Sequence, residues 1–138
     1  MNYLREFLEY INTEFGNFDG ISIHNENGFS MIAFSDFGES IDNLSIYYSV
    51  TITFMDNYPD VVIRIAKHIK NQNELENYKL VNLLNYRNSI CSFYINESEF
   101  IVIRNNFKPG GVEDILTTYK QTMDLARIEF KNFESIKE

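Results

Sequence analysis

The clearest hydrophobic pattern in this chain is an alternation of apolar and polar residues over positions 44–54. Every second side chain from Leu44 to Phe54 is apolar, and the residues between them are serine, threonine and tyrosine. A strict period of two predicts a β-strand with one dry face and one wetter face. At roughly 3.3 Å per residue, such a strand is about 36 Å long. Its apolar face needs a cover, and we expect the amphipathic segments at both chain ends to provide it.

Three segments have the spacing of amphipathic helices. Residues 2–15 form the first. Asn73, with Glu76 three residues later, is typical of the N-cap and capping box of a second helix that ends near Asn85. The third helix follows the Gly110-Gly111 break, and its apolar residues recur at alternating spacings of four and three, namely Val112, Leu116, Tyr119, Met123, Ala126, Phe130 and Phe133.

Strand-like segments and turn signals fill the remainder of the chain. Besides the long strand, the expected strands are residues 21–24, 29–34, 61–67, 90–95 and 100–104. Residues 36–40 are expected to be a loop that leads into the long strand. The resulting order, α-ββββ-α-ββ-α, predicts an α+β fold with a mainly antiparallel sheet covered by helices. We expect a single domain over residues 1–138.

Two surfaces are candidates for contact with another protein. On the last helix, Leu125 and Ile128 widen the apolar face, which suits either a long helix lying across a sheet or contact with a second chain. On the polar side of the long strand, Tyr47 lies near Thr51 and Thr53. Tyrosine among small polar residues suits adaptable protein contact, and it equally suits an ordinary half-wet sheet.

Composition narrows the classes of partner. The chain has 138 residues, with 12 Lys and Arg against 20 Asp and Glu, and a net charge of −8. This charge disfavours nucleic acid and anionic membrane surfaces as partners. The single cysteine excludes an intrachain disulfide and a multi-cysteine zinc site. The N-terminus lacks the apolar run of a signal peptide, and no stretch reaches the length of a membrane span, so we expect a cytoplasmic protein.

Candidate chemistry is sparse. His24 and His68 are expected at the surface on different strands, and Cys91 shares the phase of a buried strand, which is typical of an inert thiol. The acidic residues lie mostly in turns, and no two of them are spaced so that they must share a site. We therefore predict no catalytic, cofactor-binding or metal-binding residue, and no enzyme activity.

The second half of the chain resembles the YbjN-like family, whose members are similar in fold to type III secretion chaperones. The resemblance lies in the Leu83-Leu84-Asn85 helix end, the strand with Phe93 and Ile95, the short acidic turn, the Ile-Val-Ile-Arg strand at 101–104 and the terminal amphipathic helix. It implies a small cytoplasmic protein that dimerises and binds an extended segment of another protein, in a chaperone-like or regulatory role. The family offers no catalytic residue to carry over.

Three hypotheses of function follow. The first is a non-enzymatic protein-binding module, chaperone-like or regulatory, with a protein partner and a homodimeric state. The second is an acidic inhibitor or immunity-type protein that masks a basic partner, which predicts an acidic cluster on one surface. The third is a small-ligand binder or enzyme with a pocket on the sheet, lined by Tyr47 or Tyr48.

Overall fold

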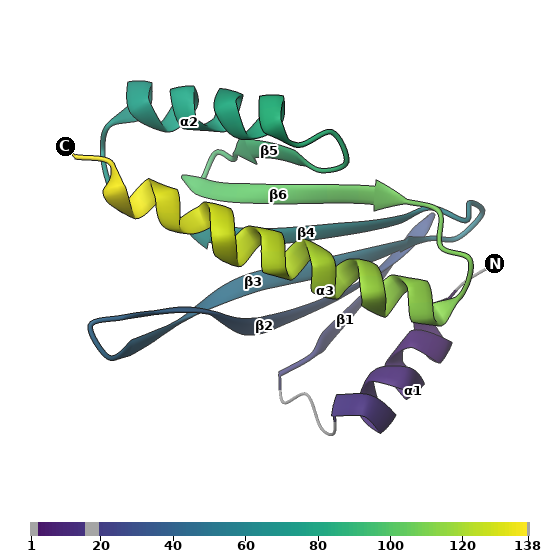
Figure 1. Cartoon of the computed structure of the whole chain (residues 1–138). Coiled ribbons are helices and arrows are strands. Elements are labelled where there is room, and N and C mark those ends of the chain that lie inside the picture. Colours follow the sequence, from purple (N-terminus) through teal and green to yellow (C-terminus); the bar gives the residue numbers. More distant parts are fainter. Residues whose placement is uncertain (1–2, 16–19, 138) are drawn as a thin grey trace.

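Six antiparallel strands form one sheet in the computed structural model, which describes residues 3–15 and 20–137 (Figure 1). The elements in chain order are α1 (Leu4–Phe15), β1 (Ser22–Glu26), β2 (Phe29–Ile41), β3 (Leu44–Met55), β4 (Val61–His68), α2 (Glu74–Arg87), β5 (Ser92–Ile95), β6 (Phe100–Phe107), α3 (Val112–Glu129) and the 3-10 helix η1 (Phe130–Ser135). The strands lie in the order β1-β2-β3-β4-β6-β5. The predicted α+β class and element order are confirmed.

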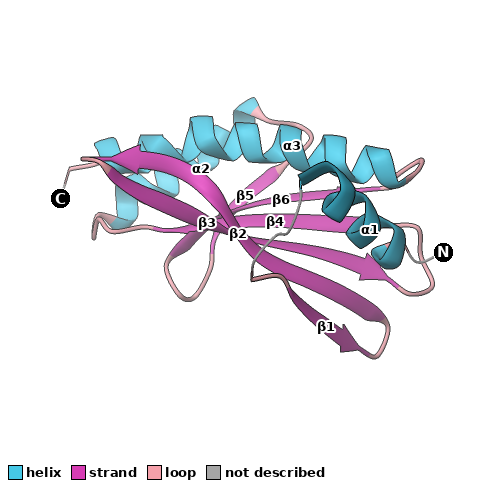
Figure 2. Ribbon diagram, turned by 90° about the horizontal axis from the view of Figure 1, so that it is seen from below, coloured by secondary structure: helices cyan, strands magenta, loops and turns pink. Residues whose placement is uncertain are grey.

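The helices lie on one side of the sheet, and no described element covers the other side (Figure 2). We call the uncovered side the open face. Its side chains include those of Ser22, His24 and Glu26 on β1, Phe29, Met31, Ala33, Ser35 and Phe37 on β2, Tyr47, Ser49, Thr51, Thr53 and Met55 on β3, Val62, Arg64, Ala66 and His68 on β4, Phe100, Val102, Arg104 and Asn106 on β6, and Ser92 and Tyr94 on β5.

The long strand β3 has the predicted phase. Tyr48, Val50, Ile52 and Phe54 are buried beneath the helices. The ring of Tyr48 packs on that of Phe130 with centroids 5.3 Å apart, so the C-terminal segment does cover this strand. Leu44 is 67% exposed, because it lies at the tip of the β2–β3 hairpin, which extends beyond the helices (Figure 1).

The expectation of a loop at residues 36–40 is wrong, because β2 continues to Ile41. A register shift between Phe37 and Glu39 places a β-bulge at Gly38. A Cβ atom at Gly38 would lie 2.2 Å from the ring of Tyr48, so this position requires glycine. The chain reverses instead at Asp42 and Asn43, whose φ angles of 51° and 66° are those of a two-residue hairpin turn.

The last helix packs as its spacing predicts. Leu116, Tyr119, Met123 and Ala126 are buried in α3, and the buried row continues into η1 with Phe130 and Phe133. At the second helix, the side-chain oxygen of Asn73 accepts a hydrogen bond from the Glu76 backbone N–H at 3.2 Å, which confirms the predicted N-cap. No helix among the described residues has the length and apolar character needed to cross a membrane.

Candidate functional site

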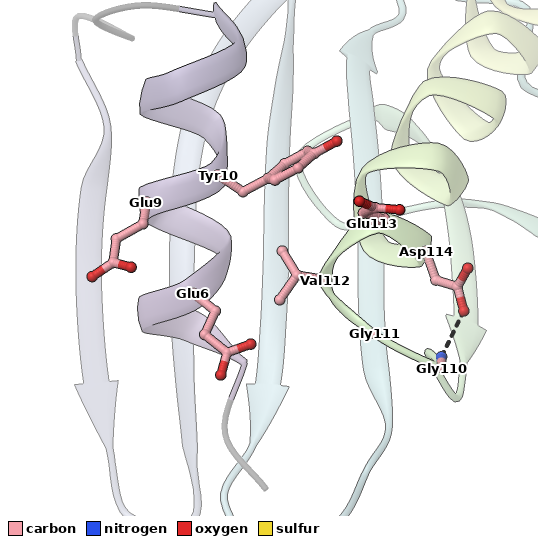
Figure 3. A pocket seen from close by; sticks show the side chains of 8 residues that line it. All are labelled: Glu6, Glu9, Tyr10, Gly110, Gly111, Val112, Glu113 and Asp114. Atoms are coloured by element: carbon pink, nitrogen blue, oxygen red, sulfur yellow. Dashed lines mark hydrogen bonds between the residues drawn. The ribbon is translucent and has the colours of Figure 1, made fainter.

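An acidic cleft of about 710 Å³ lies between α1 and the start of α3 (Figure 3). Glu6 and Glu9 project from α1, and Glu113 and Asp114 come from the first turn of α3. Each carboxylate also has a structural reason to be there. Acids at helix starts complement the helix dipole, Asp114 accepts the Gly110 backbone N–H at 2.6 Å, and Glu9 lies 3.5 Å from an arginine one turn earlier.

A second cavity, of about 360 Å³, lies between β2 and α3 and contains a polar network. The Tyr119 hydroxyl donates a hydrogen bond to Asp36. Burial, followed by this hydrogen bond, raises the pKa of Tyr119 above its ordinary value. Arg127 Nε donates to the Phe37 carbonyl at 3.0 Å, and its guanidinium lies 3.6 Å from Asp36. These groups satisfy one another, so the network ties α3 to β2.

A buried charge cluster joins the bulged end of β2 to the C-terminal segment. The Lys67 ammonium lies on the covered face and contacts the carboxylates of Glu39 and Glu134. Lys67 and Glu39 are both buried. The Tyr48 hydroxyl is also buried and lies near the Glu39 carboxylate. Burial, with the nearby charge of Glu39, raises its pKa. The cluster fixes η1 to the sheet.

The other residues considered for chemistry lie apart. His24 is exposed on the edge strand β1, whereas His68 ends β4 with its ring 5.3 Å from that of Phe100. Cys91 is a buried free thiol, and burial raises its pKa, which disfavours the reactive thiolate. Within residues 3–15 and 20–137, no group of three His, Cys, Asp or Glu side chains is placed to hold a metal ion.

The structure places the three predicted contact residues of β3 on the open face. Tyr47 is 61% exposed, and its ring contacts that of Phe37 with centroids 6.2 Å apart. Thr51 is half-buried, and Thr53 is only 8% exposed. Tyr47 and Thr51 are therefore available to a partner, whereas Thr53 contributes little surface.

Two arginines that the sequence analysis did not single out lie at the centre of the same face. Arg64 on β4 is directly opposite Arg104 on β6, and Thr51 and Ser92 flank the pair on the neighbouring strands. Among the described residues, neither guanidinium has a hydrogen bond or an ion pair. In the sequence, Arg64 interrupts an apolar run and Arg104 ends one. The pairing of β4 with β6 has no sequence signal, because α2 and β5 lie between them.

The two predicted contact residues of the last helix lie elsewhere. Leu125 is partly buried and packs against the hydrophobic core, whereas Ile128 is 66% exposed. Since α3 lies on the helical side of the sheet, neither residue shares a surface with Tyr47 (Figure 2). The structure thus divides the five predicted residues between two opposite sides of the molecule.

In comparisons with known proteins, no family model, curated protein or solved structure matches this chain. Of the candidate sites, the open face is the one where two arginine side chains have no hydrogen bond or ion pair within the described chain and lie on the same face as an exposed pair of aromatic rings.

Proposed function

We propose that this chain is a non-enzymatic protein-binding module, and that its open face binds an extended segment of a partner protein. The observation that carries the proposal is the one-sided cover of the sheet (Figure 2). Tyr47 and Phe37 leave exposed rings on this face, where small polar residues of β3 and two arginines lie among apolar side chains. Tyrosine and arginine are enriched in protein interfaces because each combines apolar area with hydrogen-bonding groups.

A chaperone-like or regulatory role in the cytoplasm is part of this proposal. The α-ββββ-α-ββ-α order is compatible with the resemblance to the YbjN-like family and to type III secretion chaperones. A broad sheet face suits an extended segment better than a compact ligand. An extended chain covers about 3.3 Å per residue, so a short segment can contact several strands at once.

Site-specific photo-crosslinking in an extract of the native cells tests the proposal. A benzophenone amino acid replaces Tyr47 on the open face or, as the matched control, Tyr86 on the helical side, where the ring is 90% exposed. We expect position 47 to form an adduct with a particular foreign protein, and position 86 to form none with that protein. Absence of an adduct at position 47, or the same foreign adduct at both positions, would contradict the proposal.

We also propose that the protein forms a homodimer, as the family resemblance implies. The outward side of α2 supports this proposal, because it exposes four large apolar residues on one helix, namely Leu75, Tyr78, Leu83 and Tyr86. Exposed apolar side chains in such number are typical of protein contacts.

The acidic cleft favours a second candidate, an inhibitor-type protein that masks a basic partner. Glu6 and Glu113 line it from the two helices, and Glu9 and Asp114 add two further acids at its edges (Figure 3). The variant Glu6→Gln/Glu113→Gln separates the two functions. If the cleft binds the partner, this variant should capture less of the partner. If the open face binds the partner, the crosslink from position 47 should be unchanged in the variant.

A further inference from the structure

The open face is distinguished by the position of its charges. The chain carries 20 Asp and Glu against 12 Lys and Arg, yet none of the open-face positions of β2 to β6 holds an acid. The nearest acid in strand register is Glu26, at the far end of the edge strand β1. The centre of this face is therefore basic, although the protein as a whole is strongly acidic.

Arg64 and Arg104 are an unfavourable pair as they stand. Directly opposite residues of an antiparallel ladder have Cα atoms about 4.5–5.5 Å apart, and like charges in such positions destabilise the sheet. Thr51 and Ser92, which continue the same row on β3 and β5, supply hydroxyl groups and no negative charge. Nothing among the described residues neutralises the two guanidinium groups.

Packing gives a structural reason for the aliphatic stems of Arg64 and Arg104, but it gives none for their two positive charges. Val62 and Val102 are 6% and 3% exposed on a face that no helix covers, so neighbouring side chains must shield them. Each valine lies two residues before an arginine on its strand, and long arginine stems commonly cover apolar surface in this way. A pair of opposite charge would shield the valines equally well and would attract rather than repel.

We infer that Arg64 and Arg104 bind a carboxylate of an acidic, extended segment in the partner protein, an inference that rests on the proposed function of the open face. A guanidinium presents a planar fork of N–H donors that matches a carboxylate. One carboxylate between the two arginines removes their mutual repulsion, and the hydroxyls of Thr51 and Ser92 lie beside it in the same row.

The charge of the whole protein favours a polypeptide over a nucleic acid. Single-stranded nucleic acid is held by a basic groove that follows its backbone and by successive stacked bases. Here the basic surface is limited to two arginines, and the net charge of −8 opposes a polyanion. An acidic side chain within an otherwise neutral segment meets only the local positive field.

A displayed library of random peptides of about ten residues, long enough to cross the sheet, tests the inference on the full-length protein. Peptides selected on the native chain are synthesised, each with a matched version in which Asn or Gln replaces Asp or Glu. Their binding is measured to the native chain, to Arg64→Gln/Arg104→Gln, and to the control Lys131→Gln/Lys137→Gln, which removes the same charge from exposed lysines of the C-terminal segment. Amide chemical shifts of Thr51 and Thr53 report whether a peptide occupies the open face.

We expect the selection to yield acidic peptides that bind the open face. Their affinity for the arginine variant should be lower by about tenfold or more, and their affinity for the lysine control should be unchanged. The amide version of each peptide should be weakened to a similar extent. Peptides that occupy the open face equally well without the arginines would overturn the inference and leave the proposed function intact. If the library yields no peptide that binds this face, both the inference and the proposed function are overturned. If a thymidine oligonucleotide binds through the arginines and no peptide binds, the ligand of the open face is a nucleic acid and not a polypeptide.

Discussion

Lys67 is a buried cation that depends on its two carboxylate partners. Its strand, β4, is apolar on both sides in sequence, and Lys67 takes the phase of Ile63 and Ile65 on the covered face. Removing a charged group from water is costly unless an opposite charge compensates it. Glu39 supplies that charge from the bulged end of β2, and Glu134 supplies a second one from η1.

We expect Lys67→Ala to lower the free energy of unfolding by about 3–5 kcal/mol, because the Glu39 carboxylate would remain buried without its cation. Urea denaturation measures this loss. Lys131→Ala is the matched control at an exposed lysine of η1, where a change within about 0.5 kcal/mol is expected. A loss below about 1 kcal/mol for Lys67→Ala would contradict the role of the cluster.

Tyr48 and Tyr119 should make the protein sensitive to alkaline pH. Burial raises the pKa of both phenols in the folded state, whereas the unfolded phenol titrates at about 10. Below that pH both states are protonated, and the stabilisation is complete. Above it the unfolded state loses protons first, so the free energy of unfolding should fall by up to about 1.4 kcal/mol per pH unit for each tyrosine.

Urea denaturation between about pH 9 and pH 11 measures this slope. Tyr119→Phe should reduce the slope, because it removes one of the two groups that titrate differently in the two states. Tyr86→Phe, which changes a 90% exposed ring, serves as the control and should retain the full slope. An unchanged slope in Tyr119→Phe would show that this phenol ionises in the folded state.

At the scale of the elements, the bulge in β2 shows how local residue preference is overridden by packing. Residues 36–40 contain Asp, Gly and Ser, which favour turns, and they were therefore expected to form a loop. In the fold they pair with β3, and the absence of a side chain at Gly38 lets the ring of Tyr48 pack against the backbone.

We expect Gly38→Ser to lower the free energy of unfolding by about 1–3 kcal/mol, because its Cβ would overlap the Tyr48 ring and force a shift in the core. Gly111→Ser is the matched control, since a Cβ at this N-cap position meets nothing within 4 Å and serine is a favourable N-cap. Thermal unfolding of the two variants makes the comparison. Equal midpoints would show that the bulge adapts without cost.

The helices illustrate what periodicity conveys and what it omits. The four-three spacing of α3 was sufficient to identify its buried side, because a helix that lies on a sheet must bury one continuous row of residues. In α2 the apolar residues encircle the helix, and only Asn77, Val81 and Leu84 are buried. Periodicity alone does not say which side of such a helix meets the sheet.

At the scale of the whole molecule, the outward side of α2 is the surface that bears on the proposed homodimer. We expect light scattering to give twice the mass of the chain for the native protein. Leu83→Glu should give the mass of one chain, because it places a charge within the apolar surface that would be buried between two copies. Lys131→Glu is the control on η1, and a monomeric native protein would contradict the dimer.

The candidate site was predicted in part. Tyr47 and Thr51 were identified because the alternation in β3 assigns them to its wetter face, and the structure leaves that face uncovered. Arg64 and Arg104 were missed because a like-charged pair has meaning only when its two strands are adjacent. Leu125 and Ile128 were grouped by sequence, whereas packing buries part of the first and exposes the second.

The sequence by itself determined the secondary-structure order and the buried side of β3 and α3, because both follow from the spacing of apolar residues along a local segment. Tertiary structure alone decided that the helices gather on one side of the sheet, that Lys67 meets Glu39, and that Arg64 lies opposite Arg104. These features depend on strand order and register, which join residues far apart in the chain. Such pairings are set by the packing of the entire core, and no local pattern records them.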